Sequence, residues 1–291
     1  MGIGFRALLA AWVACWAVIA SPSGHAQSLE GTLKKIKSSK SMVIGYRADA
    51  WPFSFAPEPG KPEGYSIELC RRIASGVQEQ LGLDKLDVKY VEVTTQNRIQ
   101  AVVDSKVDLE CGATTMTLSR MESVDFSNKI FVDGASVMVS KKSGIHRVAD
   151  LSGKKVAVIP GTTTEVALRE VIQKRFVKIE LVAVNDYAEG RAAVESGKAD
   201  GLAADRVILI GQLLKAKDPL EWTLSEDQFS YEPYALMLKR GDASFRLAAN
   251  RVLAHLYRTG EVAEIYKKWF GPLGDPPAVL ILMYVLNALP E

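Results

Sequence analysis

The order of apolar and polar positions predicts strands that alternate with helices. A short apolar strand covers residues 42–46. Apolar residues then recur every three or four positions over 66–81, the spacing of an amphipathic helix. Residues 86–93 alternate as a strand does, a helix capped by Thr94 or Thr95 carries residues 98–103, and residues 107–111 form a further strand. This order favours a mainly parallel α/β sheet, whereas the proline-rich segment 52–62 is expected to be a loop.

The same pattern restarts in the second half of the chain. Strands are expected at 156–158, 179–184 and 200–204, and helices at 162–174, 186–196 and 207–214. Two extended apolar segments, 130–139 and 232–238, can carry the chain between the halves, which predicts two lobes joined by a hinge. We therefore expect lobe 1 to comprise 27–134 and 232–291, and lobe 2 to comprise 135–231. The apolar stretch 278–289 is too short to span a bilayer and is expected to dock on lobe 1.

One short motif occurs once in each half. Residues 101–108 and, 92 positions later, residues 193–200 both run from a helix end through a turn with lysine into an apolar strand. The same offset pairs Ala113 with Asp205, just after the two strands. Open α/β sheets present their ligand-binding groups at such strand ends. The ligand is therefore expected between the lobes.

The N-terminal segment predicts export. Arg6 is followed by an uncharged apolar run and then by small residues, the features of a signal peptide over residues 1–26. Without that segment the chain carries 35 basic and 34 acidic residues, a balance that gives no reason to expect a nucleic-acid partner. Export also leaves two cysteines, Cys70 and Cys111, which form either a disulfide or two buried thiols.

Two polar turns are candidate binding elements. Thr162 and Glu165 have the spacing of a capping box, so a helix begins there with free backbone N–H groups that suit an anion. Residues 114–120 are rich in hydroxyl groups and end at Arg120, which can hold a carboxylate. The three histidines are scattered, and the sequence contains no phosphate-binding glycine loop. No metal or other cofactor is expected, and no catalytic residue.

These segments together resemble the periplasmic amino-acid-binding proteins of ABC importers, in particular the glutamate/aspartate-binding branch of solute-binding protein family 3. The resemblance runs from about residue 33 to residue 270. It is carried by residues 45–47 with 52–55, 95–99, 110–115, 125–127, 130–132, 161–166 and 195–198. It implies the two-lobed type II periplasmic-binding-protein fold with two hinge crossings. It also implies a monomer that captures an acidic amino acid by closing its cleft and delivers it to the permease of an inner-membrane ABC transporter.

The resemblance also implies roles for individual residues. Arg120, with Thr115 and Thr162, would hold the ligand's α-carboxylate, and Asp205 its ammonium group. Arg47, Thr95 and Arg98 would hold the side-chain carboxylate. Three positions complete the expected binding set: Thr163, Ala113 where the family has a serine, and Tyr187 where it has a histidine. Three arginines and one aspartate complement a dicarboxylic amino acid, which argues against glutamine.

The sequence departs from the family at further points. Arg206 replaces a second acidic residue beside Asp205. The cysteine expected near Leu236 is not there, so Cys70 is the alternative partner for Cys111. An exported enzyme resembling cyclohexadienyl dehydratase, whose substrate also carries carboxylates, is the alternative function. A receptor-kinase sensor domain is a third possibility, disfavoured because the sequence shows no C-terminal membrane helix or signalling domain.

Overall fold

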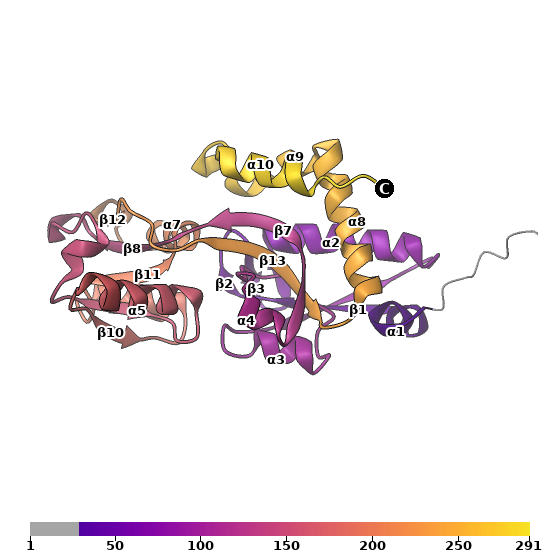
Figure 1. Cartoon of the computed structure of the whole chain (residues 1–291), viewed down its shortest axis with the longest axis horizontal. Helices are drawn as coiled ribbons and strands as arrows, with labels where there is room; N and C mark the ends of the chain where they lie inside the picture. The colour runs from indigo at the N-terminus through magenta and orange to yellow at the C-terminus, as the bar shows by residue number, and fades with distance from the viewer. Residues whose placement is uncertain (1–28) are drawn as a thin grey trace, which may run out of the picture.

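The computed structural model describes residues 29–291 and divides them into two lobes, each built on a five-stranded sheet (Figure 1). The predicted signal peptide, residues 1–26, lies outside the described residues. The sheet of lobe 1 has the strand order β5 (Asp87–Glu92), β1 (Ser41–Tyr46), β6 (Leu109–Glu110), β13 (Glu232–Lys239), β7 (Val124–Asp133). The sheet of lobe 2 has the order β10 (Glu180–Ala183), β9 (Lys155–Val158), β11 (Gly201–Asp205), β8 (Ala135–Ser140), β12 (Trp222–Leu224).

Helices cover the sheets of both lobes. Lobe 1 contains α1 (Gly31–Ser39), α2 (Tyr65–Gln80), α3 (Arg98–Val103), α4 (Leu118–Met121), α8 (Ala243–Thr259), α9 (Glu261–Phe270) and α10 (Ala278–Asn287). Lobe 2 contains α5 (Thr163–Arg175), α6 (Tyr187–Glu195) and α7 (Arg206–Leu214). Among residues 29–291, no helix combines the length and hydropathy needed to cross a membrane.

The two extended segments predicted to cross between the lobes are β7 continuing into β8, and β13. Strand β7 belongs to the first sheet and β8 to the second, with only Gly134 between them. Strand β13 returns antiparallel to β7, with Glu232 opposite Asp133 at the crossing (Figure 1). The prediction of a mainly parallel sheet holds for the three strands on which it rests, β5, β1 and β6, but each complete five-stranded sheet is mixed. In lobe 1, β5, β1 and β6 are parallel and β13 is antiparallel to its neighbours, because it enters from the other lobe.

One local prediction differs from the structure, and another is confirmed. The proline-rich segment is not a loop but a small antiparallel sheet of β2 (Asp49–Ala50), β3 (Ser54–Glu58) and β4 (Lys61–Glu63). Its prolines fit because the β3–β4 pairing is short and irregular, so few ladder N–H groups are required. Helix α3 begins at Arg98 after a turn over residues 95–97. The Thr94 hydroxyl accepts a hydrogen bond from the Asn97 amide, and the Asn97 side chain accepts one from the Thr94 amide, so Thr94 caps this turn as the sequence predicts.

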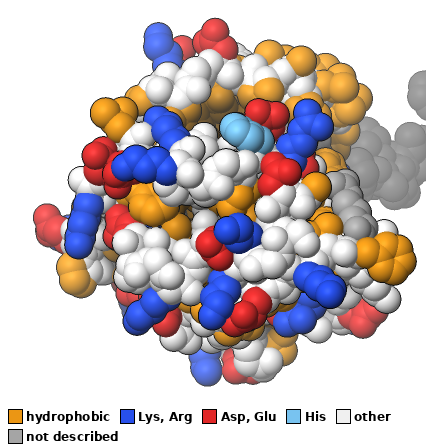
Figure 2. Space-filling view, turned by 90° about the vertical axis from the view of Figure 1, so that its left-hand side faces the viewer, with side chains coloured by type: hydrophobic (Ala, Val, Ile, Leu, Met, Phe, Trp, Pro, Cys, Tyr) orange, Lys and Arg blue, Asp and Glu red, His pale blue; other side chains and the backbone are white. Residues whose placement is uncertain are grey.

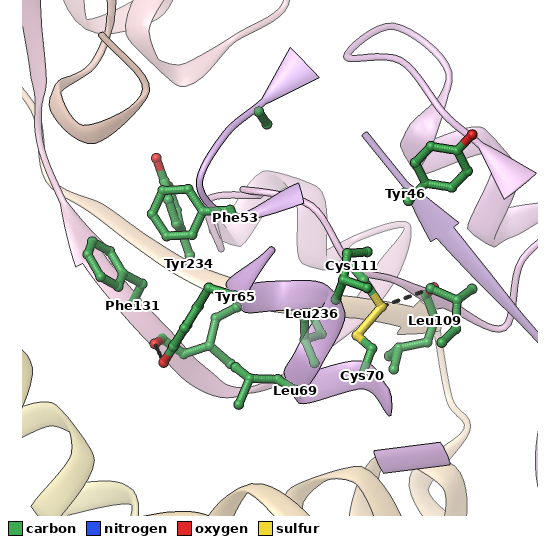
Figure 3. Close-up of a cluster of buried hydrophobic side chains, with 14 of the residues drawn as sticks. Tyr46, Phe53, Tyr65, Leu69, Cys70, Leu109, Cys111, Phe131, Tyr234 and Leu236 are labelled. Atoms are coloured by element: carbon green, nitrogen blue, oxygen red, sulfur yellow. Dashed lines mark hydrogen bonds between the residues drawn. A yellow bond between two sulfur atoms is a disulfide. The ribbon is translucent and has the colours of Figure 1, made fainter. Parts of the chain in front are cut away.

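An aromatic cluster fixes the crossing strands to the body of lobe 1 (Figure 3). Phe131 of β7 packs 4.9 Å from Phe53 and 5.0 Å from Phe270, between ring centroids. Tyr234 of β13 lies 5.1 Å from Phe53. The Tyr65 hydroxyl donates a hydrogen bond to the Ile130 carbonyl at 2.9 Å, so α2 is tied to β7 as well. The strands that cross between the lobes therefore start from a tightly packed part of lobe 1.

The apolar C-terminal stretch forms α10, which packs on β7 and α8 of lobe 1, as the sequence predicts. Leu280, Met283 and Tyr284 are its buried residues. The Tyr284 hydroxyl lies 2.8 Å from the Tyr65 hydroxyl, within hydrogen-bonding distance, so the aromatic cluster extends to the end of the chain.

Charges of both signs are interspersed on the end of lobe 2 (Figure 2). Exposed pairs on this lobe include Lys142 with Glu221 at 3.1 Å and Lys155 with Glu180 at 3.5 Å.

Candidate functional site

A small, nearly filled cavity lies between the lobes, with an accessible volume of about 10 Å³. The lining residues come from the strand ends and helix starts of both lobes: Arg98, Ala113, Thr115, Ile159, Thr162, Thr163, Thr164, Tyr187, Ala203, Ala204 and Asp205. Ala113 and Asp205, which the repeated motif pairs at the two strand ends, thus line the same space. Of the ten ligand-binding residues expected from the sequence, seven line this cavity; Arg47, Thr95 and Arg120 do not.

Helix α5 begins at the cavity with the predicted cap. The Thr162 hydroxyl accepts a hydrogen bond from the Glu165 amide at 3.1 Å. The capping box is incomplete, however, because the Glu165 carboxylate accepts a hydrogen bond from the Gly161 amide, at 2.8 Å, and not from the Thr162 amide. The first turn of α5 therefore faces the cleft with backbone N–H groups at a positive helix end.

Arg120 stands opposite this helix start. Arg120, Thr162 and Thr163 line one groove of about 1200 Å³, open to solvent, next to the inner cavity. The Arg120 guanidinium donates to the Thr115 carbonyl at 2.7 Å. Burial, reinforced by Arg98, lowers the pKa of Arg120 to about 10, so it remains cationic at neutral pH. Within the described part of the chain, no carboxylate lies within 4 Å of it.

Asp205 ends strand β11 and is 7% exposed. Its carboxylate accepts hydrogen bonds from Thr164 of its own lobe, at 2.9 Å, and from the Tyr234 hydroxyl of the crossing strand β13. Burial raises the pKa of Asp205 to about 7, and the nearby charges of Glu232 and Asp133 add to the effect. A cation placed beside this carboxylate would relieve the cost of ionising it.

A second carboxylate, that of Glu232, links the two lobes through hydrogen bonds. Glu232 accepts hydrogen bonds from Thr115 of lobe 1 at 2.5 Å and from Thr163 of lobe 2 at 2.6 Å. The Thr115 and Thr163 hydroxyl oxygens are themselves 3.3 Å apart. Thr115, expected at the ligand's α-carboxylate, and Thr163, expected in the binding set, thus already contact a carboxylate of the protein.

Arg47 is buried, at 3% exposure, and has a carboxylate partner. Its guanidinium lies 2.7 Å from Asp49 and 5.8 Å from the centre of the Tyr187 ring, across the cleft. Burial raises the pKa of the Tyr187 phenol, so the ring remains neutral. Tyr187 therefore packs as a neutral ring on a cation of the other lobe.

Arg98 and Thr95 are buried, and each has a polar side-chain atom without a hydrogen-bond partner among the described residues. Arg98 donates from one terminal nitrogen to the Thr114 hydroxyl at 2.7 Å and to the Ala113 carbonyl at 3.2 Å. Among the described residues, neither the Arg98 Nε nor the Thr95 hydroxyl has a hydrogen-bond partner. Buried polar groups are rarely left unpaired, so these atoms are candidates for contact with a polar ligand.

The charge balance deduced from the sequence is incomplete. Three acidic residues that the sequence analysis missed lie near the three arginines: Asp49, Glu110 and Glu232. The charge argument against a neutral ligand is therefore wrong as stated, since the protein supplies its own counter-charges to Arg47 and Arg98. A carboxylate two positions after Arg47 is the one signal the sequence offered.

Arg206 turns away from this site. Its guanidinium donates to the Ser225 carbonyl at 2.9 Å inside lobe 2. The substitution beside Asp205 therefore places no positive charge among the cavity-lining residues.

Cys70 and Cys111 are joined by a disulfide with a Cα–Cα distance of 6.4 Å (Figure 3). The bond ties α2 to the residue that follows β6. The Ser66 hydroxyl, also on α2, donates to the Gly112 carbonyl at 2.8 Å. Helix α2 thus supports the backbone that carries Ala113, Thr114 and Thr115. In the described range 29–291, no group of three or more metal-ligating side chains is gathered.

The chain belongs to the bacterial extracellular solute-binding proteins, family 3, whose profile matches residues 42–272. It is 38% identical over 246 residues to the L-glutamate/L-aspartate-binding protein of Pseudomonas aeruginosa, covering 84% of this chain and 82% of that protein. It is 32% identical over 270 residues to the glutamate/aspartate import solute-binding protein of Escherichia coli K12, covering 92% of this chain and 89% of the relative. The predicted family resemblance is confirmed.

Solved structures confirm the two-lobed fold. An ancestral amino acid-binding protein, described as a precursor of cyclohexadienyl dehydratase, superposes with a TM-score of 0.71 at 29% identity, covering 82% of this chain and all of the other. The holo arginine-binding protein of T. maritima superposes with a TM-score of 0.67 at 26% identity, covering 81% of this chain and 99% of the other.

Proposed function

We propose that this protein is a periplasmic receptor that closes on an acidic amino acid, glutamate or aspartate, and presents it to the permease of an ABC importer. The observation that carries the proposal is the arrangement of charge around the cleft. Arg120 of lobe 1, which has no carboxylate within 4 Å in the described structure, lines the groove at the start of α5, while the buried Asp205 lines the inner cavity. A cation and helix N–H groups suit a carboxylate, and a buried aspartate suits an ammonium group.

The side-chain end of the ligand would lie between Arg98, Thr95 and Arg47. The unpartnered Nε of Arg98 and hydroxyl of Thr95 would donate to the second carboxylate. Tyr187 and Ala113 would shape this end, since Tyr187 is a neutral ring and Ala113 has no polar side chain. The curated relatives named above bind glutamate and aspartate, which supports this ligand class.

Closure would follow from contacts made by both lobes. Arg98, Thr115 and Arg120 belong to lobe 1, whereas Thr162, Thr163 and Asp205 belong to lobe 2. A ligand that contacts both sets binds the closed form more tightly and shifts the population toward it. We extend the proposal to lobe boundaries at residues 134/135 and 231/232, to removal of residues 1–26 on export, and to a monomeric receptor in the periplasm.

A binding experiment tests the proposal directly. Mature protein, residues 27–291, is titrated calorimetrically with glutamate, aspartate, glutamine and arginine at pH 7.5. Glutamate or aspartate should bind most tightly, and the melting temperature should rise with that ligand by mass action. Binding of glutamine or arginine alone would refute the acidic-ligand assignment while leaving the family unchanged.

The dehydratase alternative has less support. The ancestral structure that links the fold to that enzyme is itself named an amino acid-binding protein. The curated relatives reported above are binding proteins as well.

A further inference from the structure

The two arginines at the side-chain end of the cleft have different counter-charges. Arg47 pairs directly with Asp49, which is partly exposed to solvent. Arg98 has no carboxylate within 4 Å in the described structure, but Glu110 is its strongest charged neighbour. The two pairs therefore act in different surroundings, and water screens the first more than the second.

A threonine links Arg98 to Glu110. The Arg98 guanidinium donates to the Thr114 hydroxyl at 2.7 Å, and that hydroxyl donates to one Glu110 oxygen at 2.9 Å. The hydroxyl therefore accepts from the cation and donates to the anion, which fixes the direction of both bonds. Thr114 and Glu110 are both fully buried.

Gly112, two positions after Glu110, leaves room for the Glu110 carboxylate and the Arg47 side chain. A Cβ on Gly112 would lie 2.3 Å from the second Glu110 oxygen and 3.1 Å from the Arg47 side chain. No larger residue fits at this position without moving one of them. That second oxygen has no hydrogen-bond partner among the described residues. A buried carboxylate with only one hydrogen bond is costly, and burial raises the pKa of Glu110 while Arg98 and the Thr114 hydrogen bond act to lower it. The charge of Glu110 therefore depends on its link to Arg98.

We propose that Glu110 is a specificity-determining residue, whose buried carboxylate positions Arg98 through Thr114 and sets how strongly the cleft prefers a ligand carboxylate over a neutral amide. The proposal rests on the proposed function, since it concerns the side-chain end of that ligand.

The physical reason is a competition between two carboxylates for one guanidinium. The ligand's second carboxylate would approach Arg98 from the cavity, while Glu110 is linked to Arg98 through Thr114. Two carboxylates near one cation repel each other, and in a buried site this repulsion is poorly screened. Glutamine, which has no charge at that end, does not experience it. Glu110 therefore restrains the preference for glutamate over glutamine.

The test is the ratio of the glutamine and glutamate dissociation constants in Glu110→Gln. Glutamine at position 110 can still accept the Thr114 hydrogen bond, so the change removes charge with little change of shape. We expect the ratio to rise about tenfold, the order of magnitude for unit charges in one partly screened site. The control is Glu92→Gln, which removes the same charge from an exposed position of lobe 1 and should leave the ratio unchanged.

An unchanged or lower ratio in Glu110→Gln would overturn this proposal. Failure of the native protein to bind glutamate or aspartate would instead overturn the proposed function, so the two failures are distinct.

A double-mutant cycle, read out by thermal unfolding, tests the coupling of Arg98 and Glu110 without any ligand. The melting temperatures of Arg98→Gln, Glu110→Gln and the double variant should not be additive, because each single change strands one buried charge and the double change removes both. Additive changes would show that the two charges are not coupled and would also overturn the proposal. If Glu110→Gln yields no folded protein, recovery of folding in the double variant is the supporting result, and continued failure to fold contradicts it.

Discussion

Glu232 accepts a 2.6 Å hydrogen bond from Thr163, so a carboxylate at the start of the crossing strand β13 holds the first turn of α5 in the other lobe. The same oxygen accepts from Thr115 of lobe 1 at 2.5 Å. The glutamate is 1% exposed. These bonds fasten the two lobes to each other at the point where the ligand's α-carboxylate is proposed to bind. The ligand and Glu232 therefore depend on the same two hydroxyls.

Replacing Glu232 by alanine should weaken the contact between the lobes. Hydrogen bonds to a charged acceptor contribute about 1.5–3 kcal/mol each, so losing two shifts an open–closed equilibrium strongly. We expect small-angle X-ray scattering of the unliganded variant to show a larger radius of gyration than the native protein. Saturating ligand should reduce the difference. Glu226→Ala, an exposed change in lobe 2, is the control; an identical radius in Glu232→Ala and native protein would argue against the fastening role.

The sequence predicts the helices and strands that form this site better than it predicts which charged residues lie near it. Ala113 and Asp205 could be placed because helix and strand periodicity locates strand ends, and open α/β sheets present ligand-binding groups at those ends, here one in each lobe. Glu110 and Glu232 could not be placed in the same way. Glu110 lies on a two-residue strand, and its neighbours Arg98 and Thr114 depend on how α3 packs. Local patterns carry no information about such tertiary contacts.

The same limit explains an error in the fold. The strand of residues 54–58 is hidden because Pro57 is unfavourable in a regular ladder, yet an irregular edge pairing accommodates it. The helix start near Thr94 could be predicted because the Thr94 cap is a local side chain–backbone interaction.

Arg120→Ala should weaken ligand binding most among the arginine changes. Its guanidinium has no carboxylate within 4 Å in residues 29–291, so its charge is available to the ligand's α-carboxylate. Removing one partner of a buried charge pair costs about 2–5 kcal/mol. Calorimetry should show this loss for glutamate and for glutamine alike, because both carry the α-carboxylate. Arg72→Ala removes an exposed arginine of lobe 1 as a control; a loss as small as that of the control would exclude Arg120 from the site.

Ligand binding should release a proton from Asp205. The pKa of Asp205 is raised to about 7 by burial and by neighbouring carboxylates, so at pH 6 it is mostly protonated in the unliganded protein. The ligand's ammonium group favours the ionised form and lowers that pKa. Calorimetry at pH 6 in buffers of different ionisation enthalpy should therefore show proton release, which fades above pH 8.

The change Asp205→Asn should abolish this proton release and weaken binding. The change Glu232→Gln should move the release to lower pH, because the Glu232 charge contributes to the raised pKa of Asp205. Heats that do not depend on the buffer at pH 6 would contradict the assignment of the ammonium to Asp205.

The unliganded protein should lose stability as the pH rises from about 4 to about 7. Burial raises the pKa of Asp133 to about 6 and that of Asp205 to about 7, both from 3.8. Between those limits the folded state binds more protons than the unfolded state, so the free energy of unfolding falls with pH. Carboxyl groups with lowered pKa values, such as Glu68 and Glu165, change the free energy of unfolding only below about pH 4.5, outside this window.

Urea unfolding at pH 5 and pH 7.5 measures this dependence. Asp205→Asn should show a smaller loss between the two pH values than the native protein does. An equal loss in both proteins would mean that Asp205 is ionised already at pH 5.

Breaking the Cys70–Cys111 disulfide should destabilise lobe 1 and loosen the site. The two cysteines are 41 residues apart, and the loop-entropy relation assigns a disulfide of that span about 4 kcal/mol. The bond also holds α2 against the backbone that leads to Thr115, which Ser66 supports through its hydrogen bond to Gly112. The double variant Cys70→Ala/Cys111→Ala should therefore unfold at lower urea concentration and bind glutamate more weakly. Native protein treated with a reductant should match the variant. If the variant lost stability while its affinity for glutamate stayed unchanged, the disulfide would serve the fold of lobe 1 without positioning the binding residues.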